Sequence, residues 1–159
     1  MTSKKMIFET NPQKANAKIM INSFMMGSLF FILTLIWSKN PTDYSLFIAS
    51  QIVFAVPLLY VSSLAYSKIG HWDKTRIWDA LGWFCNNSGN IMILNVVGLM
   101  AKNISIIISG TYFILVIFLM VVYSAINIYY KSASLKEKIF KFMFFLIILT
   151  LGGILPLIS

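Results

Sequence analysis

The sequence predicts an all-α fold: a polytopic integral membrane protein built as a bundle of five transmembrane helices, with its N-terminus cytoplasmic and its C-terminus outside. The first observation is five long apolar runs, each near the roughly 20 residues that a helix needs to cross about 30 Å of hydrocarbon. The second is composition: 58% hydrophobic and 11% charged residues, with a mean hydropathy of +0.81, do not describe a soluble domain. The third is the uneven placement of lysine and arginine, which predicts the orientation.

A short basic segment precedes a single transmembrane domain. Residues 1–18 form this segment, which we expect in the cytoplasm. The domain covers residues 19–158, and its spans are expected at residues 19–37, 44–66, 77–101, 104–130 and 135–158. The polar pieces between the spans are too short to form a core of their own, so no soluble domain is expected.

Local signals predict the ends of the first two spans. The first run follows a basic start, but residues 38–41 (Ser-Lys-Asn-Pro) follow it instead of the small residues of a cleavage site. We therefore expect a retained signal-anchor. The Asn-Pro pair ends this helix, and Thr42 or Asp43 can cap the next one.

A capping box predicts the start of the fifth span. Ser134 and Glu137 have the spacing in which each side chain bonds to the other residue's backbone N–H group. The fifth helix should therefore begin near Leu135. Because only a few residues separate it from the fourth helix, we expect these two to form an antiparallel hairpin.

The basic residues predict which side of the membrane each connection occupies. Eleven of the 13 lysines and arginines lie in the N-terminal segment, the second connection and the fourth connection with its flank. The first and third connections hold only Lys39 and Lys102. Because basic residues mark the cytoplasmic side, the three rich regions are expected inside. A plasma (inner) membrane is the expected location, with an organelle membrane as the alternative.

The third span differs from the others in carrying many carboxamides. At about 100° per residue, one face collects small and polar residues, namely Gly82, Asn86, Gly89 and Asn90. Asn87 lies on the flank of this face and Asn95 nearly opposite. A carboxamide facing lipid would lack hydrogen-bond partners, so this helix should be central. Its small residues would let another backbone approach closely.

Polar residues of several spans fall at a similar depth. Counted inward from the cytoplasmic ends, they predict one cluster, whose members are Asn22, Ser62, Ser63, Asn86, Asn87, Asn90, Tyr123 and Asn127. One hypothesis is that these groups join helices by hydrogen bonds, each contributing roughly 0.6 kcal/mol. The other is a vestibule for water, an ion or a small polar molecule. Pro57, in the middle of the second span, is a candidate hinge at this depth.

The sequence offers no catalytic, cofactor-binding or metal-binding set, and we expect neither an enzyme nor a cofactor. His71 is the single histidine and Cys85 the single cysteine, so a metal site lacks ligands. Asp79, about one turn into the third span, is expected to pair with Arg76 at the interface. The absence of other charged residues deep in the spans speaks against proton relays and voltage sensors. The short connections also exclude a nucleic-acid interface.

These observations favour a non-enzymatic multi-pass membrane subunit: a sensor, an anchor or an accessory component. We expect it to act as a homo-oligomer, with a cytosolic protein partner, or both, because some 160 residues form too small a bundle to enclose a large pathway. Anionic lipid headgroups at the cytoplasmic face are a further expected partner. The alternative is a small oligomeric ion channel or transporter lined by the third span. A weaker third hypothesis is an intramembrane enzyme or ligand-binding module using Asn86, Asn87 and Asn90.

Overall fold

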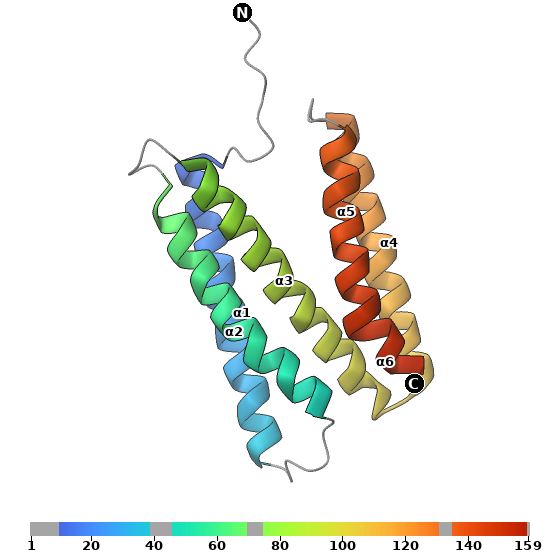
Figure 1. Cartoon of the computed structure of the whole chain (residues 1–159). Coiled ribbons are helices and arrows are strands. Elements are labelled where there is room, and N and C mark those ends of the chain that lie inside the picture. Colours follow the sequence, from blue (N-terminus) through green and yellow to red (C-terminus); the bar gives the residue numbers. More distant parts are fainter. Residues whose placement is uncertain (1–9, 39–45, 70–74, 131–134, 159) are drawn as a thin grey trace, which may run out of the picture. The chain divides into compact units, whose positions relative to one another are not determined.

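The computed structural model describes residues 10–38, 46–69, 75–130 and 135–158, and within them every regular element is helical. This confirms the predicted all-α class. The elements, coloured along the chain in Figure 1, are α1 (Pro12–Ser38), α2 (Leu46–Ser67), α3 (Thr75–Lys102), α4 (Ile106–Tyr130), α5 (Leu135–Leu149), the π-helical turn η2 (Thr150–Ile154) and α6 (Leu155–Ile158).

Four stretches of helix are long and apolar enough to cross a membrane: Pro12–Ser38, Leu46–Ser67, Ile106–Ile126 and Lys138–Ile158. Their large apolar side chains are widely exposed, as Phe24, Phe54 and Phe118 illustrate. Helices that are apolar on their outer faces require a lipid environment. The chain is therefore a helical, membrane-embedded protein. The expected third span, α3, is not among the four, because its asparagines and Asp79 lower its hydropathy.

Helix α1 begins earlier than the apolar run alone predicted. It starts at Pro12 instead of near residue 19, so Lys14 and Lys18 belong to the helix. The backbone N–H of Lys14 donates to Asn11 Oδ1 at 2.8 Å, which makes Asn11 the N-cap, and Pro12 occupies the first helical position that proline favours. The helix thus extends through a polar turn that a hydropathy count leaves out.

The chain forms two compact units, which are described separately. The first contains α1, α2 and α3 up to Ile93, and the second contains the rest of α3 with α4, α5, η2 and α6. In the first unit α1 and α2 run side by side and antiparallel (Figure 1). The buried residues of α1 recur at every seventh position, which is the spacing of a coiled-coil seam: Ala15, Asn22, Leu29 and Ile36.

Hydrogen bonds fix the register of this helix pair. Asn22 bonds to Ser62, and Lys18, one turn earlier on α1, bonds to Tyr66, one turn later on α2. The buried positions of α2 include a run alternately three and four residues apart, as expected for the matching seam: Ile48, Ile52, Ala55, Leu59, Ser62 and Tyr66. Each run of buried positions thus contains a small polar residue, Asn22 on α1 and Ser62 on α2, and these two bond to each other across the helix pair.

Glycines bring α3 close to α2 in the first unit. A Cβ atom on Gly82 would lie 2.9 Å from the ring of Tyr66. One on Gly89 would lie 2.9 Å from the Leu59 side chain and 3.3 Å from the backbone carbonyl oxygen of Ala55. The close backbone approach expected from the small residues of the third span is thus present, and α2 is the helix that makes it.

The second unit is organised around Phe113 of α4. Its ring lies where a Cβ atom on either Gly98 of α3 or Gly153 of η2 would be, so both glycines are needed for this packing. The hydroxyl of Ser109 donates to the Gly98 carbonyl at 2.6 Å, and Asn95 Nδ2 donates to the Ile148 carbonyl at 3.3 Å. These bonds join α3 to α4 and to α5.

The end of the fifth helix contains a π-helical turn that the sequence did not predict. Within η2 the N–H of Leu155 bonds to the carbonyl of Thr150, five residues earlier. Pro156, which has no N–H, follows directly, and a wider turn is one way in which a helix accommodates a proline. Helix α5 itself begins at Leu135, as predicted. The expected caps at Thr42, Asp43 and Ser134 lie outside the described residues.

Candidate functional site

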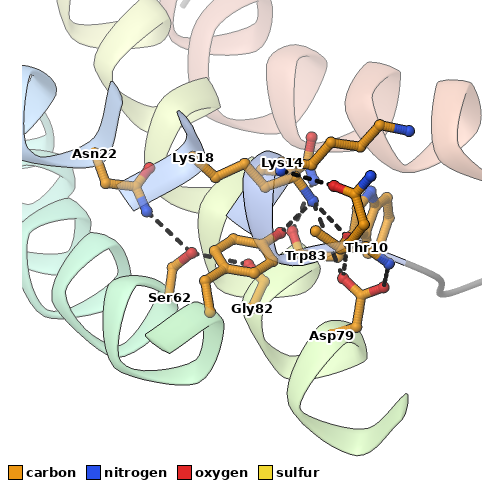
Figure 2. A network of polar contacts seen from close by, with 11 residues as sticks. Thr10, Lys14, Lys18, Asn22, Ser62, Asp79, Gly82 and Trp83 are labelled. Carbon is orange, nitrogen blue, oxygen red and sulfur yellow. Dashed lines mark hydrogen bonds and ion pairs between the residues drawn. The ribbon is translucent and has the colours of Figure 1, made fainter. Parts of the chain in front are cut away.

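A polar network joins the start of α1 to α2 and α3 in the first unit (Figure 2). At its centre is Asp79 of α3, which is only 3% exposed. Its Oδ2 accepts from the Thr10 backbone N–H at 2.8 Å, and its Oδ1 accepts from the Thr10 hydroxyl at 2.6 Å. Such charge-assisted bonds are stronger than bonds between neutral groups. The residues just before α1 are therefore held against α3.

Lys18 completes this network from α1. Its Nζ atom lies 4.0 Å from Asp79 Oδ1 and donates to Thr10 Oγ1 at 3.2 Å and to the Tyr66 hydroxyl at 2.9 Å. It also lies 4.2 Å from the centroid of the Tyr66 ring. A lysine with opposite charge, hydroxyl and aromatic partners is well compensated for its partial burial. The expected pairing of Asp79 with Arg76 is replaced by this set, since Thr10 and Lys18 occupy the carboxylate.

A second polar group lies about one turn deeper in the same unit (Figure 2). Asn22 is fully buried, and its Nδ2 donates to the hydroxyl oxygens of Ser62 at 3.1 Å and Ser63 at 3.3 Å. The Ser62 hydroxyl in turn donates to the backbone carbonyl of Gly82 at 2.9 Å. One chain of hydrogen bonds therefore runs through α1, α2 and α3, and it contains three of the eight residues that the sequence placed in one cluster.

The three asparagines predicted as part of this cluster have different surroundings. Asn87 Nδ2 donates to the Trp83 carbonyl of its own helix at 2.7 Å, so it joins no other helix by this bond. Asn86 is half-buried. Asn90 is half-buried as well, but its Oδ1 is buried without a hydrogen-bond partner, as is the Oδ1 of Asn22.

The remaining predicted residues do not share this arrangement. Tyr123 lies on α4, which belongs to the second unit, and 61% of it is exposed. The side chain of Asn127 lies outside the described part of the chain. Pro57 lies inside α2, which continues on both sides of it. Its side chain is exposed and borders a groove between α2 and α3, so the hinge remains a prediction.

Sequence reasoning missed the network of Thr10, Lys18, Tyr66 and Asp79. The Asn11-Pro12 pair would have shown that α1 starts before its apolar run, which places Lys18 inside a helix. The contact between Thr10 and Asp79 spans 69 residues and has no local signal. Within the described residues, no three His, Cys, Asp or Glu side chains come together in a way that could hold a metal ion.

The arrangement can therefore do two things chemically: it fastens helices to one another, and it leaves two carboxamide oxygens as buried acceptors. The fold and its apolar helices define the class as helical membrane-embedded proteins. Comparisons with protein-family models, curated proteins and solved structures find no match.

Proposed function

We propose that this protein is a non-enzymatic membrane subunit with five spans and a cytoplasmic N-terminus, acting in an oligomer or with a cytosolic protein. The observation that carries the proposal is the use made of the polar groups in the first unit. The amide of Asn22 and the hydroxyl of Ser62 bond to neighbouring helices, and Asp79 binds Thr10. Polar side chains used in this way support assembly and packing instead of chemistry on a substrate.

The proposal includes α3 as a fifth span, although composition alone does not mark it as one. Its 28 residues correspond to about 40 Å of helix, enough to cross the hydrocarbon. Residues that make it too polar for lipid are buried in the unit to which each belongs: Asp79, Ser88 and Asn95 are at most 4% exposed. A span surrounded by protein does not need the hydropathy of a lipid-facing one.

Exposed basic side chains at the proposed cytoplasmic ends support a role in contacting other molecules. Lys14 of α1, Lys68 after α2, Arg76 of α3 and Lys136 of α5 are all exposed. Lysines and arginines next to a membrane attract anionic headgroups and acidic protein surfaces. The partner would therefore be an acidic cytosolic protein surface, anionic lipid, or both.

The mass of the complex extracted in native lipid tests this proposal. A stable complex with a soluble protein, or an assembly of identical copies without ion conductance, would support a membrane subunit. A monomer that retains no partner would contradict it. The extraction should keep the surrounding lipid, because detergent can remove partners held mainly by charge.

A second candidate is an oligomeric channel or transporter lined by α3. The observation that favours it is the pair of buried acceptors, Asn22 Oδ1 and Asn90 Oδ1, which have no hydrogen-bond partner. Such oxygens can accept from water or coordinate a cation. Reconstituted protein would then conduct ions, and Asn90→Leu would abolish the conductance while the mass of the assembly stays the same. Loss of assembly in this variant would instead assign Asn90 to packing.

A further inference from the structure

An apolar groove opens on the surface of the first unit, between α2 and α3. Its volume is about 360 Å³, and its lining is almost wholly hydrophobic: Phe54, Pro57, Leu58, Val61, Cys85 and Met92. Cys85 is buried, whereas Phe54 and Val61 are exposed at its rim. The groove therefore has a floor formed by α3 and a wall formed by α2. Its chemistry suits a hydrocarbon chain and offers no polar partner for a soluble ligand.

The spacing of residues along both helices connects this groove to the end of α2 that carries a charge. Lys68 comes seven residues after Val61, and Trp78 comes seven residues before Cys85. Seven residues are about two helical turns, so Trp78 and Cys85 lie near one face of α3 and about 10 Å apart along its axis. Lys68 lies just beyond the end of α2, in a turn in which its N–H donates to the Ala65 carbonyl at 3.2 Å. Lys68 is exposed in the turn after α2, and Trp78 is half-buried near the start of α3. A cation and an indole about two helical turns beyond an apolar groove match the headgroup region of a phospholipid whose acyl chain lies in the groove.

We propose that this groove is the binding site of one anionic phospholipid. An acyl chain lies between α2 and α3 over Cys85, and the lipid phosphate pairs with the ammonium group of Lys68. Charge complementarity selects the occupant, because a zwitterionic lipid could fill the groove equally well but would gain less from Lys68, since its own headgroup cation offsets the charge of its phosphate. Pro57 contributes to the site, since a proline inside a helix removes an N–H group and disturbs the regular packing around it.

This inference rests on the proposed orientation, in which the end of α2 that carries Lys68 faces the cytoplasmic leaflet. The two ideas fail separately, because the side of the membrane is measured by labelling and the retained lipid is measured by mass. A bound lipid would also give the basic cytoplasmic surface a defined partner beyond its general attraction to anionic membranes.

The test counts lipids retained by the full chain in nanodiscs made from equal amounts of phosphatidylglycerol and phosphatidylcholine. Native mass spectrometry is expected to show one retained phosphatidylglycerol per chain in preference to phosphatidylcholine. Lys68→Ala should lower this preference about fivefold, the factor that one lysine near an anionic surface supplies. Val61→Trp should fill the groove and lower retention of both lipids. The matched controls are Lys136→Ala, for another exposed lysine, and Val122→Trp, because Val61 and Val122 are both 37% exposed.

A second measurement uses the unmodified chain, so that it does not depend on a variant that folds. Cys85 is the single cysteine of the protein, and its alkylation by N-ethylmaleimide in detergent should become several times slower when phosphatidylglycerol is added. Equal rates with phosphatidylglycerol and phosphatidylcholine would overturn the proposal. So would lipid retention that Val61→Trp leaves unchanged, a Lys136→Ala effect as large as that of Lys68→Ala, or a second copy of the chain in place of the lipid.

Discussion

Asp79 shows how a buried charged residue is stabilised near the start of α3. A carboxylate that is only 3% exposed is stable where its oxygens accept hydrogen bonds and a cation is near. Both conditions are met by residues outside its own helix, since Thr10 supplies two donors and Lys18 the positive charge. These polar contacts therefore fix the start of α1 against α3 in a way that apolar contacts alone would not.

We predict that Asp79→Asn lowers the free energy of unfolding by about 1.5 to 3 kcal/mol, the range for hydrogen bonds to a charged group. An asparagine keeps one acceptor but loses the charge that faces Lys18. Unfolding in mixed micelles, followed by tryptophan fluorescence, measures the change. Arg76→Gln is the matched control on the same helix, because Arg76 is exposed and should change stability by less than about 0.5 kcal/mol. Equal effects of the two substitutions would contradict the role of Asp79.

Single residues were predictable where a local pattern reports position, and unpredictable where a contact is distant. Depth counted from the helix ends placed Asn22 and Ser62 at one level, and the structure brings them to 3.1 Å. The same count grouped Asn87 with them, but its carboxamide bonds to its own helix, a local option that depth does not reveal. The pairing of Asp79 with Thr10 depends on how the start of α1 packs against α3, which no local pattern reveals.

At the scale of elements, glycines determine how closely α2 and α3 pack. Position 89 in the first unit has no room for a side chain, because atoms of α2 occupy the space in which a Cβ atom on Gly89 would lie. Gly27 of α1 is different, since a Cβ atom there would have nothing within 4 Å. The sequence pattern indicated a small-residue face on the third span, but it could not identify α2 as the helix packed against it.

These two glycines give a matched pair of substitutions. Gly89→Ala should cost about 1 to 3 kcal/mol of stability, because Leu59 must move and the carbonyl of Ala55 is close. Gly27→Ala should be neutral or should stabilise the helix by up to about 1 kcal/mol, since alanine favours helix more than glycine does. Unfolding in mixed micelles compares the two variants. If Gly27→Ala destabilises the protein as much as Gly89→Ala, close packing is not the cause.

The starts of α1 and α5 show which sequence signals predict where a helix begins. The start of α5 at Leu135 followed from the residues around it, whereas the apolar run that predicted the first span begins about two turns after the start of α1. The first turns of α1 contain Lys14 and Lys18, so a count of apolar residues does not include them in the helix. The π-helical turn η2 was missed as well, because a helix can accommodate a proline such as Pro156 by a kink or a break as well as by a wider turn.

At the scale of the whole molecule, whether α3 crosses the membrane determines on which side each later helix begins and ends. If α3 crosses the membrane, then in the proposed orientation its C-terminal end lies outside and α5 begins in the cytoplasm. If α3 stays on one side, the chain has four spans and both of these positions exchange sides. The described exposed residues Asn103, between α3 and α4, and Lys136, near the start of α5, report the two cases.

Cysteine labelling distinguishes these topologies. In a chain whose native cysteine is replaced by alanine (Cys85→Ala), Asn103→Cys should react with a membrane-impermeant maleimide in intact cells, whereas Lys136→Cys and Lys68→Cys should react only after permeabilisation. This result follows from five spans with basic connections inside, because each span reverses the side of the chain. A four-span chain with the same N-terminal orientation would give the opposite result at Asn103 and Lys136 and leave Lys68 unchanged. Lys68 therefore serves as an internal control for the first two spans, and the pair of other positions tests α3 alone.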